Sequence, residues 1–72
     1  MIVKLQTNEP DGYGGRAYAF VLTEHVIAIE PTTWQEGRDQ RYTSRIHLSS
    51  GTIINCSLPA LYTRAQIWPE ER

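Results

Sequence analysis

The sequence predicts a mainly β fold: a small five-stranded antiparallel meander or partly closed barrel, with one short C-terminal α-helix. Three observations support this prediction. Apolar and polar residues alternate along most of the chain, as they do in half-buried strands. Short clusters of glycine, proline and polar residues separate the alternating runs. Near the C-terminus the apolar residues recur at helical spacing instead.

The first three strands are expected near residues 2–7, 17–22 and 25–30. In the first, Val3 and Leu5 share one side, opposite polar residues. In the second, large apolar side chains alternate with the small Ala17 and Ala19. The third is a β-branched run in which Ile27 and Ile29 share one side. Proline at position 31 is expected to end it, because proline has no amide hydrogen to donate to a ladder.

A polar loop, TTWQEGRDQR, is expected between the third strand and a hairpin with strands near 42–48 and 52–56. Ile46 and Leu48 alternate with polar residues before the turn SSG, and Ile54 and Cys56 alternate in the same way after it. Gly51 can supply the positive φ that such a turn needs.

The helix is expected near residues 58–68, with Ser57 as its N-cap, Pro59 in its first turn and Pro69 as its end. The residues at helical spacing are Leu58, Leu61, Tyr62, Ala65 and Trp68.

A chain of 72 residues forms one small domain with a marginal core, so it gains from a staple or from self-association. The single cysteine excludes an internal disulfide, and His25 and His47 lack ligand-like spacing with it, so no metal or cofactor is expected. We therefore expect a homo-oligomer. Pairing of edge strands between chains is the expected route, with the first and last strands as candidates.

The formal net charge of -1 disfavours a nucleic-acid partner, although Arg38, Arg41 and Arg45 lie close together in sequence. No apolar run approaches the roughly 20 residues that span a bilayer, and the N-terminus lacks the pattern of a signal peptide. With one unpaired cysteine, the cytoplasm is the expected location, without membrane association.

Three stretches, IVKL, VLTEHVIAIEPTT and SRIHLSSGTIINCSLPALY, resemble the small FlbD-like flagellar and swarming-motility proteins. The matching positions are Ile2, Leu5, Val26, Ile27, Ile29, Glu30, Ile46, Leu48, Gly51 and Ser57. Two loops, NEPDGYGGR and TTWQEGRDQR, stand where that family has tight connections. The resemblance implies a compact non-enzymatic accessory protein from a bacterium or its phage, and it assigns no catalytic residue.

In an up-and-down meander these two loops emerge at the same end of the sheet. Their aromatic rings and guanidinium groups are typical of recognition surfaces, because arginine binds carboxylate or phosphate in a forked geometry and aromatic rings stack. The residues of this predicted two-loop rim are Tyr13, Arg16, Trp34, Arg38, Arg41 and Arg45. The simpler interpretation is that the glycines only permit turning, Trp34 packs over the sheet edge, and the arginines pair with Glu36 and Asp39 in solvent.

The loop DGYGGR does not fit a nucleotide cradle. It lacks the lysine and hydroxyl residue of a Walker motif, and it leads into a strand rather than a helix. A local nest of its amides remains an alternative site for a small anion.

Catalytic groups are not expected. Cys56 belongs to the apolar face of its strand, and His47 to the opposite, exposed face. His25 follows Glu24 and is expected to pair with it. Glu24 and Glu30 would lie about 20 Å apart along a strand, too far for a general acid and base pair.

Two functions follow from the two-loop rim. The first is a binding module that docks on a larger protein partner, as an accessory factor or a phage-type inhibitor. The alternative is an oligomeric binder of a nucleotide or another anionic small molecule. In that case the arginines at 16, 38, 41 and 45 would hold phosphates, while Tyr13 and Trp34 would stack on the base.

Overall fold

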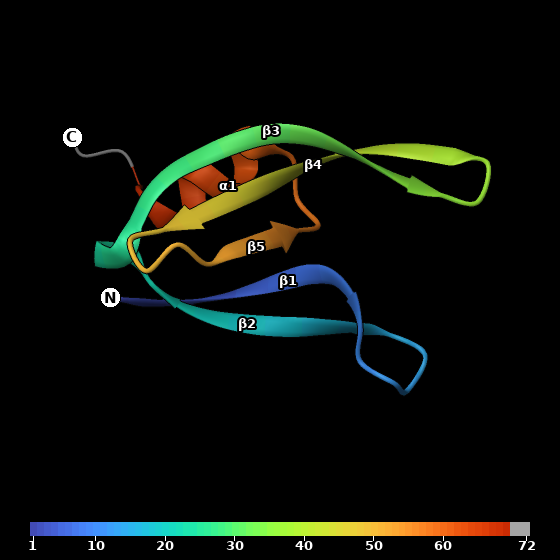
Figure 1. The fold of residues 1–72 in the computed structure, drawn as a ribbon, viewed down its shortest axis with the longest axis horizontal. Helices are drawn as coiled ribbons and strands as arrows, with labels where there is room; N and C mark the ends of the chain where they lie inside the picture. The colour runs from blue at the N-terminus through green and yellow to red at the C-terminus, as the bar shows by residue number, and fades with distance from the viewer. Residues whose placement is uncertain (70–72) are drawn as a thin grey trace.

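The computed structural model describes residues 1–69 and places five antiparallel strands in one open sheet (Figure 1). The elements are β1 (Ile2–Pro10), β2 (Arg16–Leu22), β3 (Val26–Glu36), β4 (Asp39–Leu48), β5 (Ile53–Cys56) and the helix α1 (Ala60–Ile67). A short 3-10 helix, Thr23–His25, joins β2 to β3. The predicted class, five antiparallel strands with a short C-terminal helix, is confirmed, and the sheet does not close into a barrel.

The order of the strands is β2-β1-β5-β4-β3, which differs from a simple meander at one place. After β2 the 3-10 helix carries the chain to the far edge of the sheet, and β5 returns to pair with β1 through Thr7 and Cys56. The two edges are therefore β2 and β3. The expectation that the first and last strands form the edges is wrong, because β1 and β5 pair on both sides.

The hairpin of β3 and β4 is longer than expected. The chain remains paired through the segment predicted as a loop, and Gly37, with φ of +61°, makes the turn between Glu36 and Asp39. Pro31 does not end the strand. It is tolerated because β3 is an edge strand, where the loss of one amide donor is least costly.

The core lies on one face of the sheet, under α1. Its buried apolar residues are Leu5, Val21, Val26, Ile46, Cys56 and Ile67. The predicted inward sides of β1, β4 and β5 are confirmed by these positions and by the half-buried Val3, Leu48 and Ile54 packed against them. In β2 the small alanines and Val21 face inward, so the large side chains of that strand are exposed.

An irregularity at the start of β3 reverses the direction of one side chain that was predicted to face inward. The register shifts between Val26 and Ala28, so Ile27 turns outward and is 65% exposed, while Ile29 still packs against the core. A bulge breaks the two-residue alternation on which the prediction depended.

Helix α1 begins later than expected and is not capped by Ser57. The Ser57 hydroxyl instead donates to the Gln6 side-chain oxygen at 3.1 Å. Pro59 holds the cap position, and its carbonyl accepts the Thr63 amide at 3.0 Å.

The helix also presents a different face to the sheet from the predicted one. Its buried residues are Thr63 and Ile67, whereas Leu61 and Tyr62 are exposed. The Thr63 hydroxyl lies 2.8 Å from that of Ser44 on β4, and Ile67 on the same side of the helix packs in the apolar core, so a polar and an apolar contact together orient the helix.

Candidate functional site

The loop between β1 and β2 is organised around its own aspartate. The Asp11 carboxylate accepts the amides of Tyr13 at 2.7 Å and Gly15 at 3.1 Å. Gly12 and Gly14 have φ near +90°, at +87° and +89°, which lets the chain wrap around that carboxylate. These amide bonds hold the pKa of Asp11 below its ordinary value. The predicted anion nest is thus filled by an internal carboxylate, and Tyr13 stands at the tip, 94% exposed.

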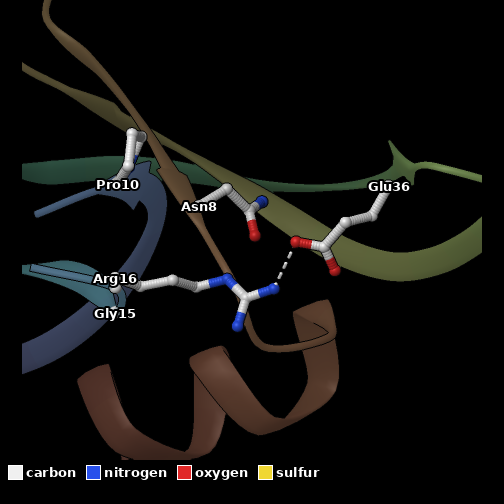
Figure 2. Close-up of a pocket in the computed structure, with 6 residues that line it drawn as sticks. Asn8, Pro10, Gly15, Arg16 and Glu36 are labelled. Carbon is white, nitrogen blue, oxygen red and sulfur yellow. Dashed lines mark hydrogen bonds and ion pairs between the residues drawn. The ribbon is translucent and has the colours of Figure 1, made fainter. Parts of the chain in front are cut away.

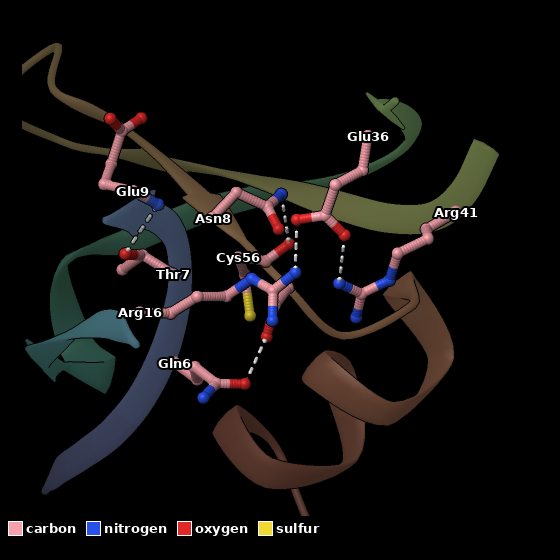
Figure 3. Close-up of polar contacts among 9 residues, drawn as sticks. Gln6, Thr7, Asn8, Glu9, Arg16, Glu36, Arg41 and Cys56 are labelled. Carbon is pink, nitrogen blue, oxygen red and sulfur yellow. Dashed lines mark hydrogen bonds and ion pairs between the residues drawn. The ribbon is translucent and has the colours of Figure 1, made fainter. Parts of the chain in front are cut away.

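Glu36 links the two edge strands at the turn end of the molecule (Figure 3). One of its oxygens accepts Arg16 Nη2 at 2.6 Å, and the other accepts Arg41 Nη1 at 3.4 Å. Arg16 begins β2, whereas Glu36 ends β3, so the pair joins strands at opposite edges of the sheet. The hydrogen bond from Arg16 is the main reason that the pKa of Glu36 lies below its ordinary value.

A pocket of about 340 Å³ lies beside this ion pair (Figure 2). Its lining residues are Asn8, Pro10, Gly14, Gly15, Arg16 and Glu36. Asn8 is only 6% exposed, and its Nδ2 donates to the Cys56 carbonyl at 3.4 Å. Its Oδ1 has no hydrogen-bond partner within residues 1–69, and Figure 2 shows the amide turned toward Arg16 and Glu36. A buried, unpaired carbonyl oxygen favours a ligand that brings a hydrogen-bond donor.

The structure brings most of the predicted rim together. Both turns lie at the same end of the molecule in Figure 1. Half-buried Trp34 is directly opposite Arg41 in the β3–β4 ladder, and Arg38 is exposed in the turn after Gly37. Arg45 is set apart. It contacts Glu30 at 3.4 Å, further along the hairpin, so it does not belong to the two-loop rim.

Glu30 and Glu24 form local pairs away from the rim. Glu30 also bonds His47 at 3.1 Å, and this contact is the main cause of its lowered pKa. The predicted pair of His25 with Glu24 is wrong, because His25 Nδ1 lies 3.2 Å from Ser49 Oγ and Glu24 binds the amino group of Met1. Among residues 1–69 no three histidine, cysteine or acidic side chains are grouped to hold a metal ion.

Sequence reasoning missed Asn8 and gave Glu36 only a minor part. The sequence carries no signal for Asn8, because the expected first strand ends at residue 7 and Asn8 opens the loop NEPDGYGGR, where asparagine is common. Glu36 was noticed only as a solvated partner of nearby arginines. Its contact with Arg16 depends on how the sheet edges approach each other, which local sequence does not encode.

Removing the Glu36 charge is expected to make the stability of the folded chain depend less on pH in the acidic range. The folded-state pKa of Glu36 lies below its unfolded value near 4.5, so its contribution is present above that value and is lost as the pH falls through the folded pKa. Between about pH 7 and pH 3, the urea midpoint of Glu36→Gln should therefore fall less than that of the native chain.

The matched control is Glu9→Gln, which removes an exposed carboxylate that makes no ion pair in the described part of the chain. The urea midpoint of this variant should fall with decreasing pH as much as that of the native chain. Equal slopes for Glu36→Gln and the native chain would contradict a stabilising role for the Arg16 contact.

Comparisons of the chain with protein-family models, curated proteins and solved structures found no match. The resemblance to FlbD-like proteins therefore stays a prediction. In the part of the chain that the structure describes, no helix is long and apolar enough to cross a membrane.

Proposed function

We propose that this protein is a small non-enzymatic binding module that docks on a larger protein partner through the two-loop rim. The observation that carries the proposal is the preformed junction at this end of the sheet. Glu36 holds Arg16 and Arg41 in place beside a pocket lined by Asn8, whose side-chain oxygen is buried and has no hydrogen-bond partner within residues 1–69. Tyr13, which is almost fully exposed, extends from the adjoining loop as an aromatic contact.

The chemistry of the rim supports a protein partner more than a nucleotide. Four carboxylates, at positions 9, 11, 36 and 39, stand against three arginines, at 16, 38 and 41. Two of those guanidinium groups already bind Glu36, and the loop amides already bind Asp11. The Asn8 oxygen needs a donor, such as a peptide N–H or a side-chain amide, whereas the phosphates of a nucleotide are mainly acceptors at neutral pH, so only its ribose or base could supply that donor. The protein would act on its partner as an accessory factor or an inhibitor, by covering part of the partner's surface.

The test has two steps: the partner is first captured and identified, and its binding is then measured with the purified protein. Affinity capture with the native chain identifies the partner, and its dissociation constant is then measured for Tyr13→Ala/Trp34→Ala. Loss of two aromatic contacts at an interface centre should weaken binding at least about 30-fold, since each such contact contributes 1 kcal/mol or more.

The control variant is Tyr62→Ala/Trp68→Ala, which removes the same two residue types from helix α1 and its end. It should bind as the native chain does. If the rim variant binds equally well, the two-loop rim is not the docking surface. If no protein is captured while one nucleotide raises the melting temperature, the alternative function is favoured.

A further inference from the structure

Strand β2 is an edge strand with an unusually apolar exposed face. Three of its large side chains alternate on the outer face, and Phe20 among them is 72% exposed. Ile2 of β1 lies opposite Leu22 and extends the same apolar surface, whereas Lys4, opposite Phe20, places its ammonium 4.4 Å from the centre of the Tyr18 ring. No charged residue occurs between Arg16 and Glu24, so the strand lacks the lysines or prolines that usually protect a free edge.

The backbone groups at this edge can be assigned from the ladder. The Thr23 amide donates to the Met1 carbonyl at 2.9 Å. In an antiparallel pair the bonded positions alternate, so Val21 and Ala19 likewise direct their backbone groups to β1. The residues whose N–H and C=O groups face the open side are Tyr18, Phe20 and Leu22.

The other edge of the sheet is protected. Strand β3 contains Pro31, which has no amide to offer, and it carries exposed carboxylates at Glu30 and Glu36. Helix α1 also packs against β3 and β4. Of the two edge strands, β2 is therefore the one that offers an incoming strand an uninterrupted set of pairing groups, and pairing of β2 with itself would stop at two chains.

We infer that β2 binds the β2 strand of a second copy, antiparallel and with Ala19 on the two-fold axis. This register overlaps the whole of Arg16–Leu22. The N–H and C=O groups of Tyr18 meet those of Phe20 in the other copy, and those of Leu22 lie opposite Arg16. The register places Tyr18 beside Phe20 of the second copy on the outer face, an aromatic cross-strand pair. It also places Arg16 of each copy opposite Leu22 of the other, where the Arg16 guanidinium can stay with Glu36 of its own chain at 2.6 Å, so no like charges meet across the axis.

The interface is small, because one strand of each copy supplies it, so we expect a weak dimer with a dissociation constant in the range of about 10 to 500 µM. Sedimentation equilibrium across that range should show the mass rising from 8.3 kDa toward twice that value. Amide hydrogen exchange at Tyr18, Phe20 and Leu22 should slow as the concentration rises, while exchange at solvent-exposed turn amides should not change.

Phe20→Pro should remove the dimer, because it deletes an outward N–H while leaving the bonds to β1 intact. Phe20→Lys is the second variant, which places like charges near the axis and needs no change in backbone. Tyr42→Lys is the control, since Tyr42 is an equally exposed aromatic on β4 and should leave the dimer unchanged.

Three results would each overturn this dimer: a native chain of 8.3 kDa at about 1 mM, a dimer that survives Phe20→Lys, or association without slower exchange at the three edge amides. Each of them leaves the docking proposal standing, because the rim is tested with different variants.

Discussion

Ile46→Ala is expected to destabilise the folded chain by about 3 kcal/mol, within the range of 2 to 5 kcal/mol that large-to-small core changes cost. Ile46 lies on β4, next to β5 near the middle of the core, with 0% of its surface exposed. A domain of 72 residues has a total stability of about 4 to 11 kcal/mol at typical values per residue. The variant should therefore lose about a quarter or more of its stability, measured as a lower urea midpoint with an unchanged slope.

Ile27→Ala provides the matched control for this change. The same atoms are deleted, but Ile27 is 65% exposed beside the bulge at the start of β3. Ile27→Ala should lower the free energy of unfolding by less than about 1 kcal/mol, because little apolar surface is lost from the core. If both isoleucine variants lose similar stability, the assignment of the sheet faces is wrong.

The sequence predicted the strands and their inward sides best where one face of a strand is buried and the other is exposed to solvent. Val3 and Leu5, and later Ile46 and Cys56, alternate with polar residues, so periodicity alone identified their strands and inward sides. The turn at Gly51 was equally clear, because its φ of +93° suits glycine and little else.

The sequence predicted poorly where a feature depends on contacts between distant segments. Whether β5 pairs with β1 is decided by a single bridge, Thr7 to Cys56, at a separation that no local pattern reports. Pro31 looked like a strand end, although an edge position makes it harmless. The apolar spacing in helix α1 predicted a buried face with Leu61 and Tyr62, whereas the buried face carries Thr63 and Ile67.

The candidate site shows the same division. The meander placed the two turns at one end, which the structure also does. The Glu36 contacts and the orientation of Asn8 depend on how the two sheet edges approach each other, so only the structure could reveal them. The aromatic and arginine residues in the sequence indicated where the two-loop rim would lie. The pocket beside it became visible only in the structure.

The polar centre of the core gives the second large effect. Ser44 donates to the Leu58 carbonyl at 2.8 Å, and Thr63 also reaches that carbonyl, at 3.3 Å. The two hydroxyls lie 2.8 Å apart, and Cys56 Sγ is 3.5 Å from Thr63 Oγ1. Either hydroxyl alone can satisfy the carbonyl that precedes the helix.

We therefore expect Ser44→Ala and Thr63→Val each to cost about 1 kcal/mol, and the double variant to cost about 3 to 4 kcal/mol. The surplus arises because only the double change leaves the Leu58 carbonyl without its donors, and an unsatisfied carbonyl costs about 1 to 3 kcal/mol. A double-mutant cycle from urea denaturation measures this coupling.

The sign of the coupling distinguishes two accounts of how α1 is held. A double variant that costs more than the two single changes together means that Leu58 is the group being satisfied, and that the hydroxyls are alternative donors. A double variant that costs less means that the direct contact between Ser44 and Thr63 is the main stabilising bond, because either single change would already remove it. In both cases the hydroxyl groups orient the helix together with the buried Ile67, and Leu61→Ser on the exposed face should be tolerated.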